Sequence, residues 1–232
     1  FPKGRVSPIQ ERQMTTVLDS NIHCVAVEGT FDDCQDLVKA SFNSPEFRDR
    51  VKLGAVNSIN WCRVLAQTTY YFWSYLRVTD NPENKGAKVG FSVPTGNFGD
   101  ILAGFYAKQM GLPVGKLIVA TNENDILHRF FTKGEYHRES IAKTISPSMD
   151  ICVSSNFERY LFFLAGNDAS KLAQWMKTFE ETKKLTIAGD LLNTAQSHFS
   201  SARADTAMTL NVIKDYHEKY NYVLCPHSAV GV

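Results

Sequence analysis

The sequence predicts an α/β fold built on parallel strands, because two strand–loop–helix units follow one another in its middle. The apolar segment 88–93 leads through a glycine-bearing loop into a helix expected over 101–110. A second apolar segment, 116–121, leads through a polar turn into a helix over 126–131. Consecutive units of this kind imply parallel strands joined by right-handed crossovers. Ligands of such sheets bind at the carboxyl ends of the strands, where the glycine loop and the polar turn are expected.

The flanking elements are predicted from their hydrophobic patterns. The apolar segment 22–27 is expected to be a strand, and residues 31–42 carry apolar side chains at roughly helical spacing. A long, largely apolar helix is expected to begin near residues 57–63, and its composition predicts burial on most sides. From about residue 156 to residue 217 the pattern becomes helical and amphipathic.

Composition and charge exclude two classes of partner. The 232 residues are 44% hydrophobic, which is enough for a substantial core. The formal net charge of +1, from 25 basic and 24 acidic side chains, creates no field that would recruit nucleic acid or an anionic membrane. No apolar run approaches the ~20 residues of a membrane span. An anionic ligand must therefore be bound by a local site.

The cysteines indicate a reducing compartment. They are scattered, odd in number and never arranged as Cys-x-x-Cys, so buried free thiols are expected at Cys24, Cys34, Cys62, Cys152 and Cys225. The cytoplasm is the expected location, or a plastid if a transit peptide precedes the sequence. The chain starts at Phe1 and stops soon after the strand-like segment 222–227, which predicts a piece of a longer protein.

The sharpest local signal is the loop SVPTGNFGD at residues 92–100. An apolar strand followed by a glycine loop and a helix directs several backbone N–H groups and a helix dipole at one point, which suits a phosphate. The loop lacks the Gly-Lys-Ser/Thr of a Walker A motif and the Gly-x-Gly-x-x-Gly of a dinucleotide site. It therefore predicts a phosphate-bearing cofactor other than ATP or NAD. The alternative is a strand-to-helix turn that needs glycine only for its geometry.

Several sequence blocks resemble the threonine synthase family, in the branch found in fungi and many bacteria. They occur in order from one end of the chain to the other: GRVSPIQE at 4–11, QMTT at 13–16, VEGTFDDCQ at 27–35, NSINW at 57–61, PTGNFGD at 94–100, ATNEND at 120–125, SMDI at 148–151 and PHSAVG at 226–231.

The resemblance implies a fold, a reaction and a domain division. It implies an α/β fold of type II, the tryptophan-synthase-β-like fold with three αβα layers, here incomplete. Residues 1–56 would belong to its smaller α/β domain and residues 57–232 to the larger cofactor-binding domain with a helical C-terminal portion. The implied enzyme is a carbon–oxygen lyase acting on phosphates. It uses pyridoxal 5′-phosphate to convert the small molecule O-phospho-L-homoserine and water into L-threonine and phosphate, as a monomer or homodimer.

By the same resemblance, the glycine loop surrounds the cofactor phosphate. Gly96, Asn97, Phe98, Gly99 and Asp100 occupy the family's cofactor-binding positions, and the backbone amides from Gly96 to Gly99 are the implied donors. Asp100 is expected to cap the following helix, because a carboxylate would repel the phosphate. For Asn97 the alternative role is an Asx turn that stabilises the loop.

The resemblance also implies a second anion site, for the phosphate of the substrate. Asn57, Ser58 and Arg63 match the family pattern Asn-Ser-x-Asn-x-x-Arg, and an amide, a hydroxyl and a guanidinium at a helix start suit a phosphate. A surface ion pair is the alternative for Arg63, and Asn60 is expected only to cap the helix.

Two further side chains are weaker candidates. Arg159 is able to contact an anion, although Glu158 and a helix start offer it ordinary partners. His227 is able to reach the site, although a lone histidine is more often structural. The remaining histidines have no metal or triad spacing, so no metal is expected.

Two features of the family are missing from this sequence. The lysine that the family joins to its cofactor lies upstream in a Phe-Lys-Asp-like context, which no lysine here has, and Lys3 is not assigned to that role. The hydroxyl residue near the pyridine nitrogen lies downstream of Val232. No catalytic residue is therefore assigned, and the chain alone is expected to be inactive.

Two alternatives to threonine synthase remain open. A related phospholyase would release phosphate and a keto acid, but such relatives carry Ala-Met where this loop has Asn97-Phe98. A non-catalytic descendant that keeps the fold for binding would have no chemical need for the glycine loop or for the Asn57, Ser58 and Arg63 set.

Overall fold

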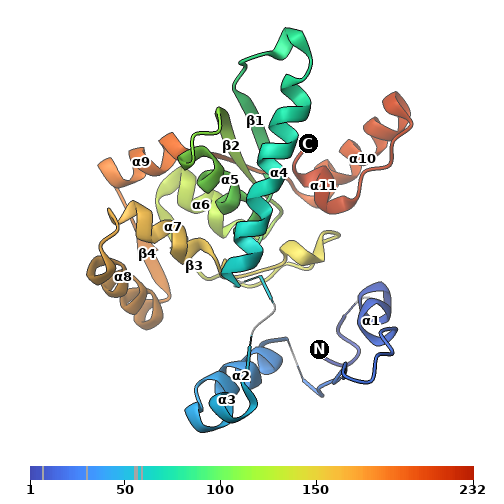
Figure 1. The fold of residues 1–232 in the computed structure, drawn as a ribbon, viewed down its shortest axis with the longest axis vertical. Helices are drawn as coiled ribbons and strands as arrows, with labels where there is room; N and C mark the ends of the chain where they lie inside the picture. The colour runs from blue at the N-terminus through green and yellow to red at the C-terminus, as the bar shows by residue number, and fades with distance from the viewer. Residues whose placement is uncertain (7, 30, 55–56, 59) are drawn as a thin grey trace. The chain divides into compact units, whose positions relative to one another are not determined.

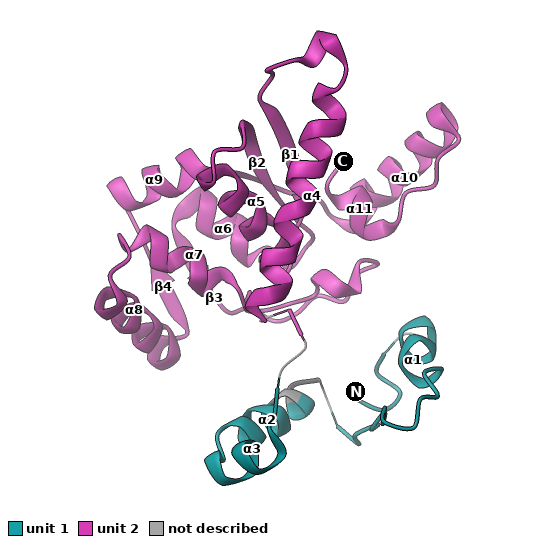
Figure 2. Cartoon of the chain, in the orientation of Figure 1, with its two compact units in different colours: residues 1–55 teal, residues 56–232 magenta. Residues whose placement is uncertain are grey.

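Three parallel strands form the main sheet of the computed structural model, which describes residues 1–6, 8–29, 31–54, 57–58 and 60–232. Ser7, Thr30 and Ile59, which belong to three of the sequence blocks, lie outside the described residues. The chain divides into two units, residues 1–55 and residues 56–232, shown in different colours in Figure 2.

The first unit contains three helices, α1 (Pro8–Thr15), α2 (Phe31–Phe42) and α3 (Pro45–Val51). The expected helix over 31–42 is thus present. The strand expected over 22–27 is wrong, because this segment forms only an isolated bridge between Val27 and Pro2. Among the described residues, its backbone bonds are a local one from Ile22 N to Asp19 O (2.9 Å) and a few to the first residues of the chain, as in Val27 N to Phe1 O (2.8 Å), whereas a strand needs a partner of comparable length.

The second unit holds the parallel sheet. Strands β1 (Val89–Pro94), β2 (Val114–Thr121) and β5 (Phe199–Arg203) lie in the order β1-β2-β5, and both neighbouring pairs are parallel. Figure 1 shows α5 (Gly99–Gln109) between β1 and β2 along the chain, followed by α6 (Ile126–Lys133) after β2. Both predicted strand–loop–helix units are therefore confirmed. Strands β3 (Glu135–His137) and β4 (Lys184–Thr186) form a separate antiparallel pair.

The other helices surround an aromatic core. They are α4 (Trp61–Thr79), α7 (Phe157–Leu164), α8 (Ala169–Thr182), α9 (Asp190–His198), α10 (Thr206–Tyr220) and α11 (Pro226–Val230), with short 3₁₀ turns at Pro82–Asn84 and Pro147–Met149. The core brings together fully buried rings from five different elements or loops: Phe98, Phe105, Phe130, Phe157, Tyr160 and Phe199. No helix of the described ranges is long and apolar enough to cross a membrane.

The burial predicted for α4 is wrong on most of its surface. Only Val64, Thr68 and Tyr71 are buried, on the face that packs against α5. Trp73 is 66% exposed, and Leu76 is exposed beside it. The cysteines are also less buried than expected: all five are free, as predicted, yet three are exposed and none is buried.

Gly134 ends α6 in the left-handed region, with φ of 73°. We expect Gly134→Ala to lower the free energy of unfolding by about 2–4 kcal/mol, because a Cβ would meet the carbonyl oxygen of Ile187 and would also make the positive φ costly. Denaturant unfolding of the intact protein measures the change.

Gly166 supplies the matched control for this variant. It has a similar φ of 78°, but nothing lies within 4 Å of an added Cβ. Gly166→Ala should therefore cost only the backbone contribution, about 1 kcal/mol. Equal losses for the two variants would show that the contact with Ile187 is not what requires glycine at Gly134.

Candidate functional site

The glycine loop leaves a row of backbone amides without acceptors. Strand β1 ends at Pro94 and α5 begins at Gly99. The first amide of this helix that reaches a carbonyl is that of Leu102, which donates to Phe98 O (3.1 Å). None of the amides of residues 96–101 donates to any residue that the structure describes. Unpaired N–H groups at a helix start form a binding site for an anion.

The two glycines of the loop are required by close approach rather than by their backbone angles. Neither has a positive φ. A Cβ at Gly96 would lie 3.2 Å from both the Cα of Met149 and the carbonyl oxygen of Ser148. A Cβ at Gly99 would lie 3.4 Å from Nδ2 of Asn156. Side chains at these positions would push apart the segments that enclose the row of amides.

Phe98 is the residue of the loop with unusual backbone geometry. It adopts the left-handed conformation, with φ of 63°, which costs a residue other than glycine about 1 kcal/mol or more. Its side chain is only 1% exposed and contacts four aromatic rings of the core. The ring therefore anchors the loop, and only the backbone of Phe98 is able to face a ligand.

The expectation that Asp100 caps α5 is wrong. The helix begins at Gly99, two residues earlier than expected, and its cap position is occupied by Phe98. Instead, Tyr71 of α4 donates its hydroxyl to the backbone and side-chain oxygens of Asp100 (3.0 and 3.1 Å). Asp100 keeps an exposed side, yet loss of water around its carboxyl raises its pKa, and the Tyr71 hydrogen bond opposes that shift. Burial likewise raises the pKa of Tyr71.

Arg63, in the same compact unit as the glycine loop, presents a guanidinium that has no partner among the described residues. It lies in the first turn of α4, is exposed, and makes no ion pair or side-chain hydrogen bond with a described residue. The surface ion pair offered as its alternative role is therefore absent from this part of the chain. Asn60 caps α4 as expected, since its side chain accepts from Cys62 N (2.9 Å). Asn57 and Ser58 are exposed just before it.

Ser154 and Ser155, which the sequence did not single out, hold the glycine loop from the side. The hydroxyl of Ser154 donates to Gly96 O (2.8 Å), and that of Ser155 donates to Oδ1 of Asn97 (3.1 Å). The Asn97 side-chain oxygen thus serves a distant segment, and the Asx turn is not formed with described residues. Two serines before a helix ordinarily suggest capping, so local pattern alone gives no sign of this contact.

Asn156 is fully buried and joins the two predicted anion sites. Its Nδ2 donates to Ser58 O (2.8 Å) and to Asn97 O (3.1 Å), and its backbone N donates to Asn97 O as well. Its Oδ1 accepts from Nε of Arg159 (3.3 Å), whose guanidinium lies 5.6 Å from the ring centre of Trp61. Arg159 therefore supports the junction of the loops.

The other weak candidate, His227, contacts a segment that packs against the glycine loop. Its Nε2 accepts from the backbone N of Ser148 (3.1 Å), and Ser148 O is one of the atoms that enclose Gly96. A Cβ at Gly231, after the same helix α11, would lie 2.8 Å from the ring of Pro94. Helix α11 thus packs closely against the end of β1.

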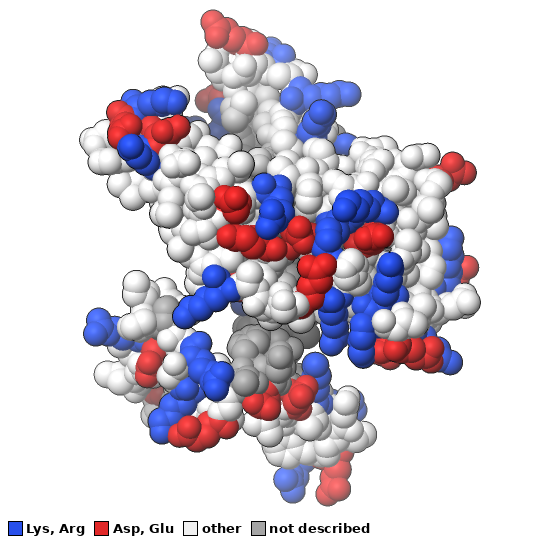
Figure 3. Space-filling model, turned by 180° about the vertical axis from the view of Figure 1, so that it is seen from behind, with Lys and Arg blue, Asp and Glu red and all other residues white. Residues whose placement is uncertain are grey.

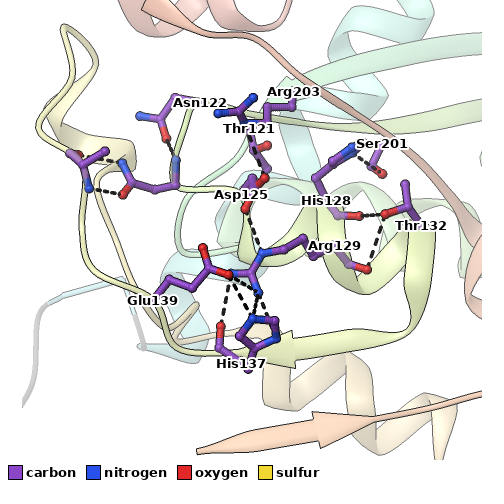
Figure 4. A network of polar contacts seen from close by, with 12 residues as sticks. Thr121, Asn122, Asp125, His128, Arg129, Thr132, His137, Glu139, Ser201 and Arg203 are labelled. Carbon is purple, nitrogen blue, oxygen red and sulfur yellow. Dashed lines mark hydrogen bonds and ion pairs between the residues drawn. The ribbon is translucent and has the colours of Figure 1, made fainter.

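The polar turn after β2 is occupied by interactions within the protein (Figure 4). Asn122 and Asn124 both donate to Oδ1 of Asp150, at 2.8 and 2.9 Å. Asp125 lies between Arg129 (2.8 Å) and Arg203 (3.4 Å). These bonds hold the segment that ends at Asp150 against the carboxyl end of β2. Of the two predicted ligand positions, the glycine loop therefore has the free donors.

In the same network, burial lowers the pKa of His128, whose Nδ1 lies 3.0 Å from the Ser201 hydroxyl.

On the face seen in Figure 3, basic and acidic side chains lie among one another. The site is thus built from backbone donors and from Arg63 rather than from a basic surface.

Comparison with known proteins identifies the relatives of this chain. No family model matches it. It is 51% identical to the threonine synthase of Schizosaccharomyces pombe and 48% identical to that of Saccharomyces cerevisiae, across its whole length, and 40% identical to threonine synthase-like 2 of Rattus norvegicus. The chain spans about half the length of these relatives.

The solved structures that this chain resembles are also threonine synthases. The chain superimposes on a pyridoxal-phosphate-bound threonine synthase from Brucella melitensis with a TM-score of 0.91 at 48% identity, covering 100% of this chain and 49% of that one. For the yeast threonine synthase the TM-score is 0.89 at 48% identity, covering 99% and 47%. The expected tryptophan-synthase-β-like α/β fold is confirmed by these neighbours. The chain belongs to the threonine synthase family.

Proposed function

We propose that the protein containing this chain is a threonine synthase that uses pyridoxal 5′-phosphate to convert O-phospho-L-homoserine and water into L-threonine and phosphate. The observation that carries the proposal is the row of amides over residues 96–101 and the guanidinium of Arg63 in the same unit, all without partners among the described residues. Two anion sites suit a reaction in which cofactor and substrate each bring a phosphate.

The residues of the glycine loop fit the phosphate of this cofactor. The amides of Gly96, Asn97, Phe98 and Gly99 would hold it. The two glycines have no side chain that could cover these amides, and neighbouring atoms already lie where a Cβ at either position would make contact. Asp100 would remain bonded to Tyr71 and fix the first turn of the helix. When bound, the cofactor would supply an electron sink for the carbanions that form by proton removal before the γ-phosphate leaves and water adds at Cβ.

Asn57, Ser58 and Arg63 would hold the phosphate of the substrate. Arg63 offers a bidentate, permanently charged donor, and Ser58 adds a hydroxyl beside it. We assign no catalytic residue to these 232 residues and place the cofactor-bound lysine in the other half of the protein. Residues 1–56 are proposed to belong to the smaller α/β domain and residues 57–232 to the larger one.

The proposed partner is the small-molecule substrate, with no role for nucleic acid or a membrane. A cytoplasmic enzyme, monomeric or homodimeric, is proposed on the near-neutral charge and the five free cysteines, with a plastid as the alternative compartment.

Product identification tests the reaction. The full-length protein is incubated with pyridoxal phosphate and O-phospho-L-homoserine, and amino acids, keto acids and phosphate are quantified. Threonine and phosphate in equal amounts support the proposal. Phosphate with 2-oxobutyrate and no threonine would assign the protein to the phospholyases instead. A protein that binds no cofactor and releases no phosphate would be a non-catalytic descendant of the fold.

A further inference from the structure

Two loops that are far apart in the sequence meet at one side chain. The segment before α4 carries Ser58, and the glycine loop carries Asn97, 39 positions later in the numbering. The Nδ2 group of Asn156 donates to the backbone carbonyl of each, at 2.8 and 3.1 Å. Both hydrogens of one amide are thus used, one for each loop.

The orientation of this amide is fixed by its surroundings. Two carbonyl oxygens on one side require the NH₂ group there, because a carbonyl cannot donate. Nε of Arg159 faces Oδ1 from the other side (3.3 Å), and a guanidinium only donates. A flipped amide would therefore oppose all three partners.

The contact is closed to water and leaves no room for another arrangement. Asn156 has 0% exposure, so a carbonyl that lost this donor would have no solvent to replace it. A Cβ added at Gly99 would lie 3.4 Å from Nδ2, at van der Waals contact, so the amide has little spare room on that side. The backbone N of Asn156 adds a third bond, to Asn97 O (3.1 Å).

We propose that Asn156 is a positioning residue that fixes the two phosphate sites relative to each other, so that its loss weakens cofactor and substrate binding together. The inference rests on the proposed function, in which the glycine loop takes the cofactor phosphate and the segment before α4 takes the substrate phosphate. Asn156 touches neither phosphate and acts through the Ser58 and Asn97 carbonyls.

The test compares three variants of the full-length enzyme. Asn156→Asp keeps the shape but replaces the donor with an acceptor, and should raise both the Kd for pyridoxal phosphate and the KM for O-phospho-L-homoserine about tenfold or more. Ser154→Ala removes only a bond to Gly96 O and should raise the cofactor Kd alone. Arg63→Ala should raise KM alone.

Two separate measurements distinguish the proposed positioning role of Asn156 from a merely structural one. Cofactor Kd comes from titration of the apoenzyme by absorbance, and KM is measured with pyridoxal phosphate at saturation. General destabilisation would lower the melting temperature and leave KM at saturating cofactor within twofold of the wild type, which would overturn the proposal. If Asn156→Asp does not fold, Asn156→Ser, which keeps one shorter donor, replaces it in the test. Asn156→Ser should raise both the cofactor Kd and the KM above the wild-type values, by less than the factor expected for Asn156→Asp.

The wild-type enzyme separates failure of this inference from failure of the proposed function. A wild type that forms no threonine refutes the reaction regardless of the variants. An active wild type whose Asn156 variants lose affinity for only one of the two ligands refutes the coupling and leaves the reaction intact.

Discussion

Replacing Arg63 by alanine in the full-length enzyme is expected to raise the KM for O-phospho-L-homoserine about 100-fold, since a charge-assisted bond to a phosphate contributes roughly 2–3 kcal/mol. The guanidinium is exposed and unpaired within the described part of the chain, so its removal breaks no internal bond. Cofactor absorbance should change little, because the glycine-loop amides bind the cofactor phosphate without a cation. Steady-state kinetics and an absorbance spectrum of the variant measure both effects.

Arg77 provides a matched control on the same helix. It lies near the other end of α4, where its guanidinium is 5.8 Å from the ring centre of Trp73. Arg77→Ala removes the same charge but should leave KM within twofold of the wild type. Loss of cofactor from Arg63→Ala, with unchanged KM once cofactor is added back, would mean that Arg63 serves the cofactor phosphate instead.

The parts of the fold that follow from local pattern were predictable. Both parallel strands and the helices after them are continuous apolar or amphipathic segments with glycine or polar residues between them, and the structure places β1, β2, α5 and α6 there. The extent of burial on α4 was not predictable. Its apolar residues are a property of the sequence, but which of them are covered depends on which elements pack beside the helix, and only one face meets α5.

The candidate site likewise has a part that could be predicted from the sequence and a part that could not. The glycine loop could be found because backbone donors need a glycine-bearing turn at a strand end, which is a local pattern. The roles of Phe98 and Asp100 could not, since capping rules favour Asp100 and tertiary packing of the Phe98 ring sets the helix start two residues earlier. Asn156 could not be found either, because its acceptors lie about 60 and 98 positions away.

The second large effect is expected at Phe98. Phe98→Ala should lower the free energy of unfolding by about 3–5 kcal/mol, because a fully buried ring leaves a cavity among Phe131, Phe157, Tyr160 and Phe199. Phe98→Gly should be about 1 kcal/mol less destabilised than the alanine variant, because glycine tolerates the φ of 63°. Equal stability of the two variants would show that the loop relaxes out of the left-handed conformation once the ring is gone.

A second buried phenylalanine separates the stability of the core from the position of the loop. Phe179 on α8 is 4% exposed and packs on Tyr136, so Phe179→Ala should cost a similar free energy. Of these two residues only Phe98 belongs to the glycine loop, so only its variants should raise the Kd for pyridoxal phosphate, when both are measured well below their melting temperatures. Equal losses of cofactor affinity would mean that the amides are positioned by the overall stability of the unit. A loss confined to Phe98 would mean that one aromatic ring, held in the core, sets the geometry at which a phosphate is bound.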